Sequence, residues 1–166
     1  MQANTSWQVM PASPHDIAAI SAACRAQVRR SALVAAAAAV VPVPGLDIAA
    51  DTALLLRLIP QINAQFGLSP AQIERLSVSQ QLIVYKAITA VGGLMIGKLI
   101  TQQLVIQSLK IVGLRLSAKQ AVKFVPLAGQ ALSAALSYTA LRYVCEAHIK
   151  QCAQVAATLL LTEKMA

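Results

Sequence analysis

The sequence predicts an all-α protein, and three observations lead to that fold class. Ser-Pro helix-start signals begin at Ser13 and Ser69, each ahead of an apolar segment. Apolar residues recur at helical spacing, as over residues 83–91. Proline and glycine gather at two corners, residues 41–47 and 124–129, each between apolar helical segments. We therefore expect a compact helical bundle of about six to eight helices built on two Pro/Gly-cornered helical hairpins.

The composition indicates one apolar, basic domain. Of 166 residues, 57% are hydrophobic, 4% aromatic and 12% charged, so the core must be built from Ala, Leu, Ile and Val. The net charge of +8 favours an anionic membrane surface or a cytoplasmic protein as partner. No nucleic acid is expected, because no basic stretch is interleaved with aromatics. We expect a flexible N-terminal tail over residues 1–12 and a single helical domain over residues 13–166.

The three cysteines form no CxxC pair and are odd in number. Without a disulfide framework or zinc spacing, a reducing cytoplasmic setting is expected, with no metal and no cofactor. Cys145 and Cys152 are one heptad apart and are expected in the core. His148 is expected to be a surface or packing residue rather than a ligand, because the other histidine is far away in sequence.

The first helix is expected to begin at Ser13 as N-cap, with Pro14 at its first position and Asp16 in its first turn. It should run to Val41, because Pro42 and the proline two residues later disfavour helix in the residues before them.

The first corner combines Pro42, Pro44 and Gly45, and the next helix begins beside Asp47. Glycine permits the sharp reversal, and a carboxylate is favourable near a helix N-terminus. Asp47 and Asp51 share a face at i,i+4 spacing, and paired carboxylates can bind a metal or share a proton. We favour a structural role, in which the helix dipole and a hydrogen bond or basic partner from elsewhere stabilise them, because no histidine is near.

The middle of the chain predicts shorter helices. Pro60 should end or kink the second helix, and Gly67 should terminate its continuation. Capping boxes at Ser69 and Ser77 predict two further helix starts. The helix expected over residues 98–110 is apolar on most sides, which is typical of a central buried helix, and should break at the glycine three residues later.

Residues 92–98 match the phosphate-loop pattern GxxxxGK, but Leu99 replaces the Ser or Thr that would hold Mg²⁺. No aspartate follows Asp51 to coordinate a metal downstream. The alternative is that Gly93 and Gly97 form a small-xxx-small surface on which two helices pack closely. We favour this helix-packing interpretation.

The second corner carries Pro126 and Gly129 and repeats the layout of the first. Gly129 follows Gly45 by 84 positions, about half the chain, which is compatible with an internal duplication. The last helix carries Arg142, Glu146 and Lys150 at i,i+4 spacing, a typical salt-bridged surface stripe.

Six basic residues are candidate contacts to lipid or to a partner. Three lie late in the first helix and three form an i,i+4 stripe after the break at residue 113. We favour an ordinary solvated helix face for both groups, with contact to lipid or a partner as the alternative. The candidates are Arg25, Arg29, Arg30, Arg115, Lys119 and Lys123.

Membrane-spanning helices are not expected. A span needs ~20 largely apolar residues, and the uncharged runs here are shorter or interrupted by Lys86, Lys98 and Lys110. A re-entrant or surface-lying hairpin and a soluble bundle with buried Ala-rich helices both remain open.

The run Val-Pro-Val-Pro-Gly-Leu-Asp-Ile-Ala-Ala-Asp at residues 41–51, continuing to Phe-Gly-Leu-Ser at 66–69, resembles the YcjF-like domain of unknown function. That domain is similar to the EcsC family and to the C-terminal helical region of immunity-related GTPase-like proteins. Residues 123–129 resemble its second landmark, so the likeness covers about residues 29–150. The resemblance implies membrane association or a separate P-loop GTPase partner, and it supplies no catalytic residues.

The sequence therefore predicts a non-enzymatic α-helical module that docks on a membrane, peripherally or through a re-entrant hairpin. Two alternatives stay open: a soluble cytoplasmic binding partner of a P-loop GTPase, and a pore-forming or toxin-related protein. The expected location is the cytoplasm, peripheral to the inner face of the membrane.

Overall fold

The computed structural model describes residues 10–38, 46–93, 95–117 and 128–165, and within these ranges it contains helices and turns but no strand. The all-α class is confirmed. α3 is a single turn of 4 residues, so five described helices are longer than one turn, fewer than the six to eight predicted. In chain order the elements are α1 (Pro14–Ala38), α2 (Leu46–Gln65), α3 (Pro70–Ile73), α4 (Val78–Val91), α5 (Gln102–Ser117) and α6 (Ala128–Met165).

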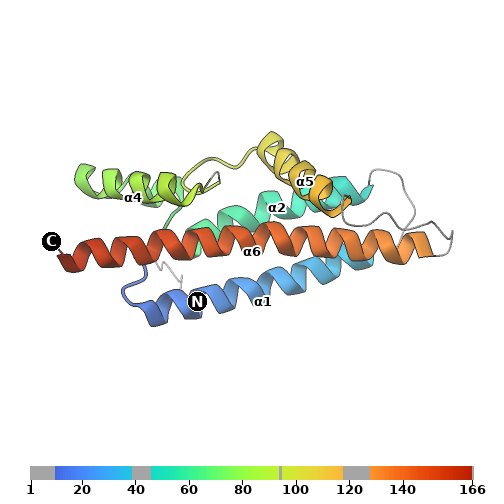
Figure 1. Ribbon diagram of the computed structural model, residues 1–166, viewed down its shortest axis with the longest axis horizontal. Helices are drawn as coiled ribbons and strands as arrows, with labels where there is room; N and C mark the ends of the chain where they lie inside the picture. The colour runs from blue at the N-terminus through green and yellow to red at the C-terminus, as the bar shows by residue number, and fades with distance from the viewer. Residues whose placement is uncertain (1–9, 39–45, 94, 118–127, 166) are drawn as a thin grey trace, which may run out of the picture.

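α6 is the axis of the molecule (Figure 1). It contacts α1, α2, α4 and α5. α1 runs antiparallel to α6 along one side, while α4 and α5 lie on the other side, over opposite halves of α6. The 38 residues of α6 make this arrangement possible, because a helix of that length spans roughly 57 Å at 1.5 Å per residue.

The seam between α1 and α6 is built by helical periodicity. The buried residues of α1 follow one another at intervals of three or four positions: Ile17, Ser21, Cys24, Val28 and Ala32. α6 buries residues at similar spacing, including Leu141, Cys145 and Cys152. Each fully buried aliphatic side chain contributes roughly 1.5–3 kcal/mol, so this seam is a main source of stability. The predicted core positions of Cys145 and Cys152 are confirmed.

α1 also packs against α2, and glutamines bridge the two helices. Gln27 Nε2 donates to Gln61 Oε1 at 2.6 Å, and Gln65 Nε2 donates to Gln27 Oε1 at 3.0 Å. The corner between these helices, with Pro42 and Pro44, lies outside the described residues. The internal duplication inferred from the two corners stays a prediction.

Three predicted helix starts are confirmed. The backbone N–H of Asp16 donates to Ser13 Oγ at 3.1 Å, which caps α1. Ser69 N donates to the Gln72 side chain at 3.0 Å ahead of α3. At α4, Ser77 and Gln80 exchange hydrogen bonds reciprocally, as a capping box requires. Each of these signals acts within a few residues of the helix start, and each predicted start is found in the structure.

The predicted end or kink at Pro60 is not an end, because α2 continues through it to Gln65. Proline costs about 3 kcal/mol inside a helix. Ile59 and Ile62, on either side of it, are fully buried, while Pro60 itself is exposed. Burial of the apolar face therefore outweighs the lost backbone hydrogen bond. α6 is likewise continuous, from Ala128 to Met165.

Gly67 ends α2 as predicted. It has φ +73°, and Leu68 N donates to Asn63 O at 2.8 Å while Gly67 N donates to Ala64 O, the pair of bonds that defines a Schellman motif. Just before α1, Met10 is half-buried against the core and Pro11 is buried, so the end of the predicted tail lies against the bundle.

The predicted helix–helix contact through Gly93 and Gly97 is wrong. Gly92 ends α4 with φ 71°, and Gly93 N donates to Ile88 O, so the chain leaves the helix there. Both glycines of the predicted motif therefore lie in the turn between α4 and α5. Met95 and Ile96 in this turn are buried.

α5 is not the central buried helix predicted. It begins at Gln102 rather than at residue 98, continues past Gly113 to Ser117, and packs on α6 and α2 at the outside of the bundle. Val105 is buried in it, whereas Gln103, Gln107 and Lys110 are exposed. α6 already occupies the centre, and one glycine costs only about 1 kcal/mol inside a helix.

Candidate functional site

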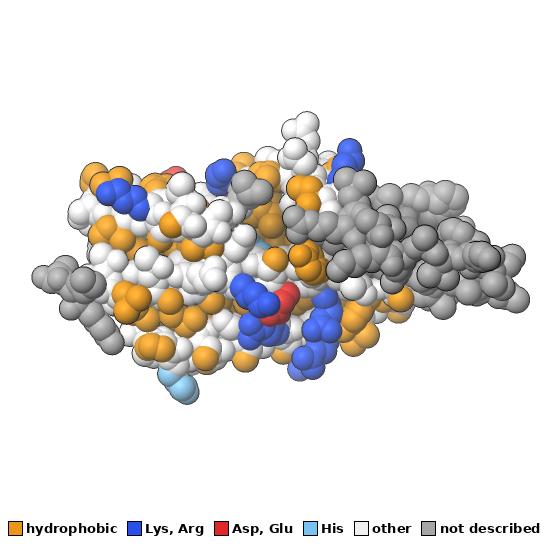
Figure 2. All heavy atoms as spheres, viewed as in Figure 1, with side chains coloured by type: hydrophobic (Ala, Val, Ile, Leu, Met, Phe, Trp, Pro, Cys, Tyr) orange, Lys and Arg blue, Asp and Glu red, His pale blue; other side chains and the backbone are white. Residues whose placement is uncertain are grey.

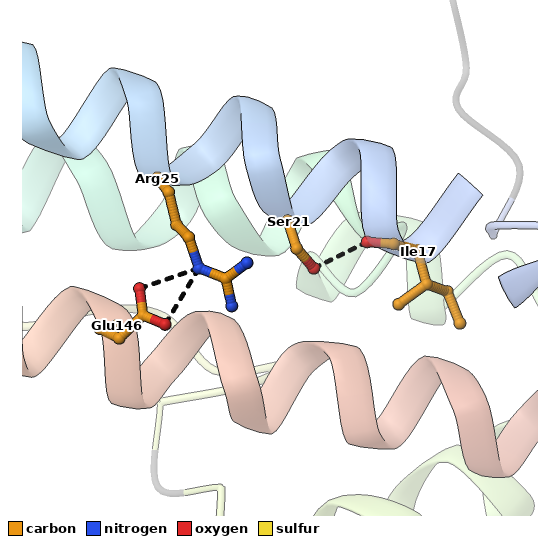
Figure 3. Close-up of polar contacts among 4 residues, drawn as sticks. All are labelled: Ile17, Ser21, Arg25 and Glu146. Carbon is orange, nitrogen blue, oxygen red and sulfur yellow. Dashed lines mark hydrogen bonds and ion pairs between the residues drawn. The ribbon is translucent and has the colours of Figure 1, made fainter. Parts of the chain in front are cut away.

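The three predicted basic residues of α1 are all exposed. Arg25 Nε donates to both carboxylate oxygens of Glu146 on α6 at 3.0 Å (Figure 3). The two side chains are 43% and 34% exposed, and an ion pair of this kind contributes about 0–1 kcal/mol. Arg29 and Arg30 follow one turn further along α1. The pair therefore adds little to the α1–α6 packing that the buried residues of the two helices provide.

Apolar residues follow these arginines on the same exposed side of α1. Leu33 is 56% exposed and Val34 is 72% exposed. In Figure 2, Lys and Arg side chains surround one acidic group near the middle of the face that α1 and α6 share, with hydrophobic side chains beside them. Exposed aliphatic residues next to cations make this part of α1 a candidate contact surface.

On α6, the predicted stripe of Arg142, Glu146 and Lys150 pairs differently from the expectation. The ion pair of Glu146 goes across to Arg25. The Arg142 guanidinium lies 5.6 Å from the centre of the Tyr138 ring, a cation–π contact. Arg142 and Lys150 are exposed and add positive charge to the face shared with α1.

The remaining predicted site residues are only partly described. Pro42, Pro44, Gly45, Lys119, Lys123 and Pro126 lie outside the described residues. Arg115 is in α5, Gly129 is in the first turn of α6 and Asp47 is at the start of α2, and the surroundings of these three are also outside the description.

Asp51 has a partner from a distant part of the chain. Asp51 is 8% exposed, and its carboxylate accepts from Ser137 Oγ at 2.6 and 2.7 Å, which joins α2 to α6. This is the kind of hydrogen bond that a structural role for Asp51 requires. Among the described residues, no three His, Cys, Asp or Glu side chains are placed to share a metal ion.

A second polar contact joins α2, α6 and the turn after α4. Asn63 Nδ2 donates to Met95 O at 3.0 Å, so its Oδ1 faces His148 Nε2 at 2.9 Å. Because Oδ1 can only accept, His148 carries its proton on Nε2. Cys152 Sγ lies 3.6 Å from both groups. We call Asn63, His148, Cys152 and the Met95 carbonyl the buried polar cluster.

Burial sets the protonation of this region. It lowers the pKa of His148 to about 4, so the imidazole is neutral at pH 7. Burial also raises the pKa of Cys24 to about 11 and of Cys145 to about 12, and it raises the pKa of Cys152 further. These thiols are not nucleophilic at neutral pH. His148 and Cys152 are 0% exposed, so a substrate would have no access to them.

The packing role expected for His148 holds, whereas its surface alternative is wrong. His148 Nδ1 has no hydrogen-bond partner within the described part of the chain, an unusual state for a buried nitrogen. Sequence reasoning missed Asn63 entirely. The available signal was its position between Ile62 and Phe66 on the apolar face of α2, where a polar residue needs an internal partner.

Comparison with family models, with curated proteins and with solved structures found no match. Of the helices that the structure describes, none combines the length and apolarity needed to cross a bilayer.

Proposed function

We propose that this chain is a non-enzymatic helical module that binds peripherally to an anionic membrane surface, on the inner face of the membrane. The observation that carries the proposal is on α1, where exposed Arg29 and Arg30 are followed one turn later by exposed Leu33 and Val34. Arginine attracts lipid phosphate, and the aliphatic pair gains from leaving water at the interface.

The energetics fit reversible binding. Each Lys or Arg near an anionic leaflet contributes about 1 kcal/mol, an attraction that falls off within the Debye length of ~8 Å at physiological salt. The chain has a net charge of +8, so its long-range field adds to the local contacts. Binding should therefore depend on anionic lipid and weaken as salt rises.

Vesicle flotation tests the proposal. The full chain should float with phosphatidylglycerol-containing vesicles at low salt, float much less at 0.5 M NaCl, and stay behind with pure phosphatidylcholine vesicles. Failure to float with anionic vesicles at low salt would reject the proposed function. Dye release in the same samples separates surface binding from the pore-forming alternative, for which leakage is required.

A second candidate, binding to a separate P-loop GTPase, is motivated by the resemblance to the YcjF-like domain and by a surface on α4. Val78, Leu82 and Tyr85 are 84%, 55% and 47% exposed and follow one another at i, i+4 and i+7. This stripe is typical of a helix face that meets a protein partner. Co-purification of a GTPase that is lost with Leu82→Ser, but kept with Arg29→Glu, would favour this function over membrane binding.

A further inference from the structure

The outward side of α1 has an unusual composition for an exposed helix surface. From Ala18 to Ala37, its exposed positions comprise six alanines, three arginines, Leu33 and Val34. Asp16, in the first turn, is the one acidic residue on α1. Solvated helix faces ordinarily mix both signs of charge with polar side chains. We call these exposed positions the α1 outer face.

The arrangement of the arginines on this face is also specific. At 100° per residue, Arg25 and Arg29 fall on the edge nearer α6, and Arg30 falls about 100° from Arg29 on the other side. Ala26 and Leu33 project between them. Long arginine side chains at the edges of an apolar strip can reach phosphate while the strip meets the acyl boundary, which is the pattern of a helix lying in a membrane interface.

The neighbouring helix extends the same surface. Arg25 is paired with Glu146, and α1 and α6 are antiparallel, so the next turn of α1 toward Arg29 runs beside the turn of α6 that holds Arg142. Arg142 is exposed, and so is Lys150 on the other side of Glu146. One carboxylate thus stands among several cations, as Figure 2 shows.

The exposed surface of α4 differs in composition from the α1 outer face. α4 exposes more large apolar side chains than α1, but Lys86 is the one cation among its exposed residues. An anionic bilayer therefore has charge complementarity with the α1 outer face and little with α4. A protein surface would be the better match for α4.

We infer that α1 lies flat on the anionic membrane, with its outer face against the phosphate and upper acyl region and with α4 pointing away from the lipid. This inference rests on the proposed membrane binding and adds the contact face and the orientation. Because most side chains in the strip are alanine, the contact is shallow and is dominated by charge. Arg29 and Arg30 should each contribute roughly fivefold to the affinity, from about 1 kcal/mol per basic residue, whereas Arg25 is already paired with Glu146.

The native thiols permit a direct test of orientation. Cys24, Cys145 and Cys152 are 0% exposed, so an introduced surface cysteine can be labelled selectively in the folded protein. We would compare Ala26→Cys on α1 with the matched variant Ala90→Cys on α4, both at exposed alanines, each carrying a polarity-sensitive fluorophore. Unlabelled wild-type protein after the same treatment checks the selectivity.

Vesicles of phosphatidylglycerol and phosphatidylcholine are then added, and flotation verifies that each labelled protein is bound. The label at residue 26 should shift to the blue and become accessible to a lipid-borne quencher, while the label at residue 90 should change little. Bound protein in which the label at residue 90 responds and the label at residue 26 does not would overturn the orientation and leave membrane binding intact. Absence of flotation for the wild type and for both variants would instead reject membrane binding, and the orientation with it.

Discussion

Polar residues have different roles on the α1 outer face and in the buried contacts between α2 and α6. Inside, Asp51 and Asn63 each hydrogen-bond a partner more than 80 residues away, at 2.6–2.9 Å, and both residues are buried. Outside, Arg29 and Arg30 are exposed and add little to stability. Burying a polar group costs free energy unless the group is paired, so the buried pairs specify the fold. An exposed charge costs little free energy and is available to bind a partner. Mutations in the two regions should therefore separate stability from binding.

The largest effect is expected from Asn63→Ala. The change leaves the Met95 carbonyl and the His148 Nε2–H buried without their shared partner, and each such group costs about 1–3 kcal/mol. The free energy of unfolding, measured by urea denaturation, should fall by about 4 kcal/mol. The exposed control Gln154→Ala should change it by less than about 0.5 kcal/mol. A small loss for Asn63→Ala would mean that the buried polar cluster does not hold the turn after α4.

Acidification should weaken the same cluster. The folded-state pKa of His148 is about 4, against an ordinary value of 6.5, so the unfolded chain binds the proton first as the pH falls. The stability that depends on a neutral His148 is therefore fully present above pH 6.5 and is lost as the pH falls toward 4. The loss is on the order of 3 kcal/mol from this group. The variant His148→Gln, which keeps a donor but cannot ionise, should lack this part of the pH dependence in parallel urea titrations at pH 7 and pH 4.5.

Ser137→Ala tests the other buried contact. Hydrogen bonds to charged groups contribute about 1.5–3 kcal/mol, so the unfolding free energy should fall by about 2 kcal/mol. Binding to anionic vesicles should not change, because Ser137 is buried between α2 and α6. Reduced vesicle binding by a folded Ser137→Ala protein would indicate that this contact has more than a structural role.

Glu146→Gln should have the smallest effect on stability and an informative effect on binding. Loss of the exposed ion pair with Arg25 should cost less than about 1 kcal/mol in thermal or urea unfolding. Removing the one carboxylate among the cations should strengthen binding to anionic vesicles several-fold. Weaker binding would show that the Arg25–Glu146 pair is needed to shape the surface.

The sequence was informative wherever the structure depends on local signals. Ser13 and Ser77 start helices as predicted, and Gly67 ends one, because capping and left-handed backbone are decided within a few residues. Continuity through Pro60 and the outer position of α5 could not be predicted in this way. Both depend on how much apolar surface the rest of the molecule buries.

The features of the candidate site likewise include some that could be predicted from the sequence and some that could not. The exposure of Arg25, Arg29 and Arg30 could be predicted from the sequence, because arginine is almost never fully buried unless it is paired. The pairing of Arg25 with Glu146 could not, since it requires the antiparallel register between residues 121 positions apart. His148 was ambiguous for the same reason, because its partner Asn63 lies on another helix.

The central claim is that exposed arginines of α1 bind the membrane without contributing to the fold. The most direct measurement is flotation of Arg29→Glu/Arg30→Glu with phosphatidylglycerol-containing vesicles, beside the matched charge reversal Lys86→Glu/Lys98→Glu at exposed sites away from α1. Both variants should unfold at the same urea concentration as the wild type. The α1 variant should lose at least about tenfold in affinity, and the control should lose much less. Equal losses in the two variants would contradict the account, because binding would then follow total charge and not this face.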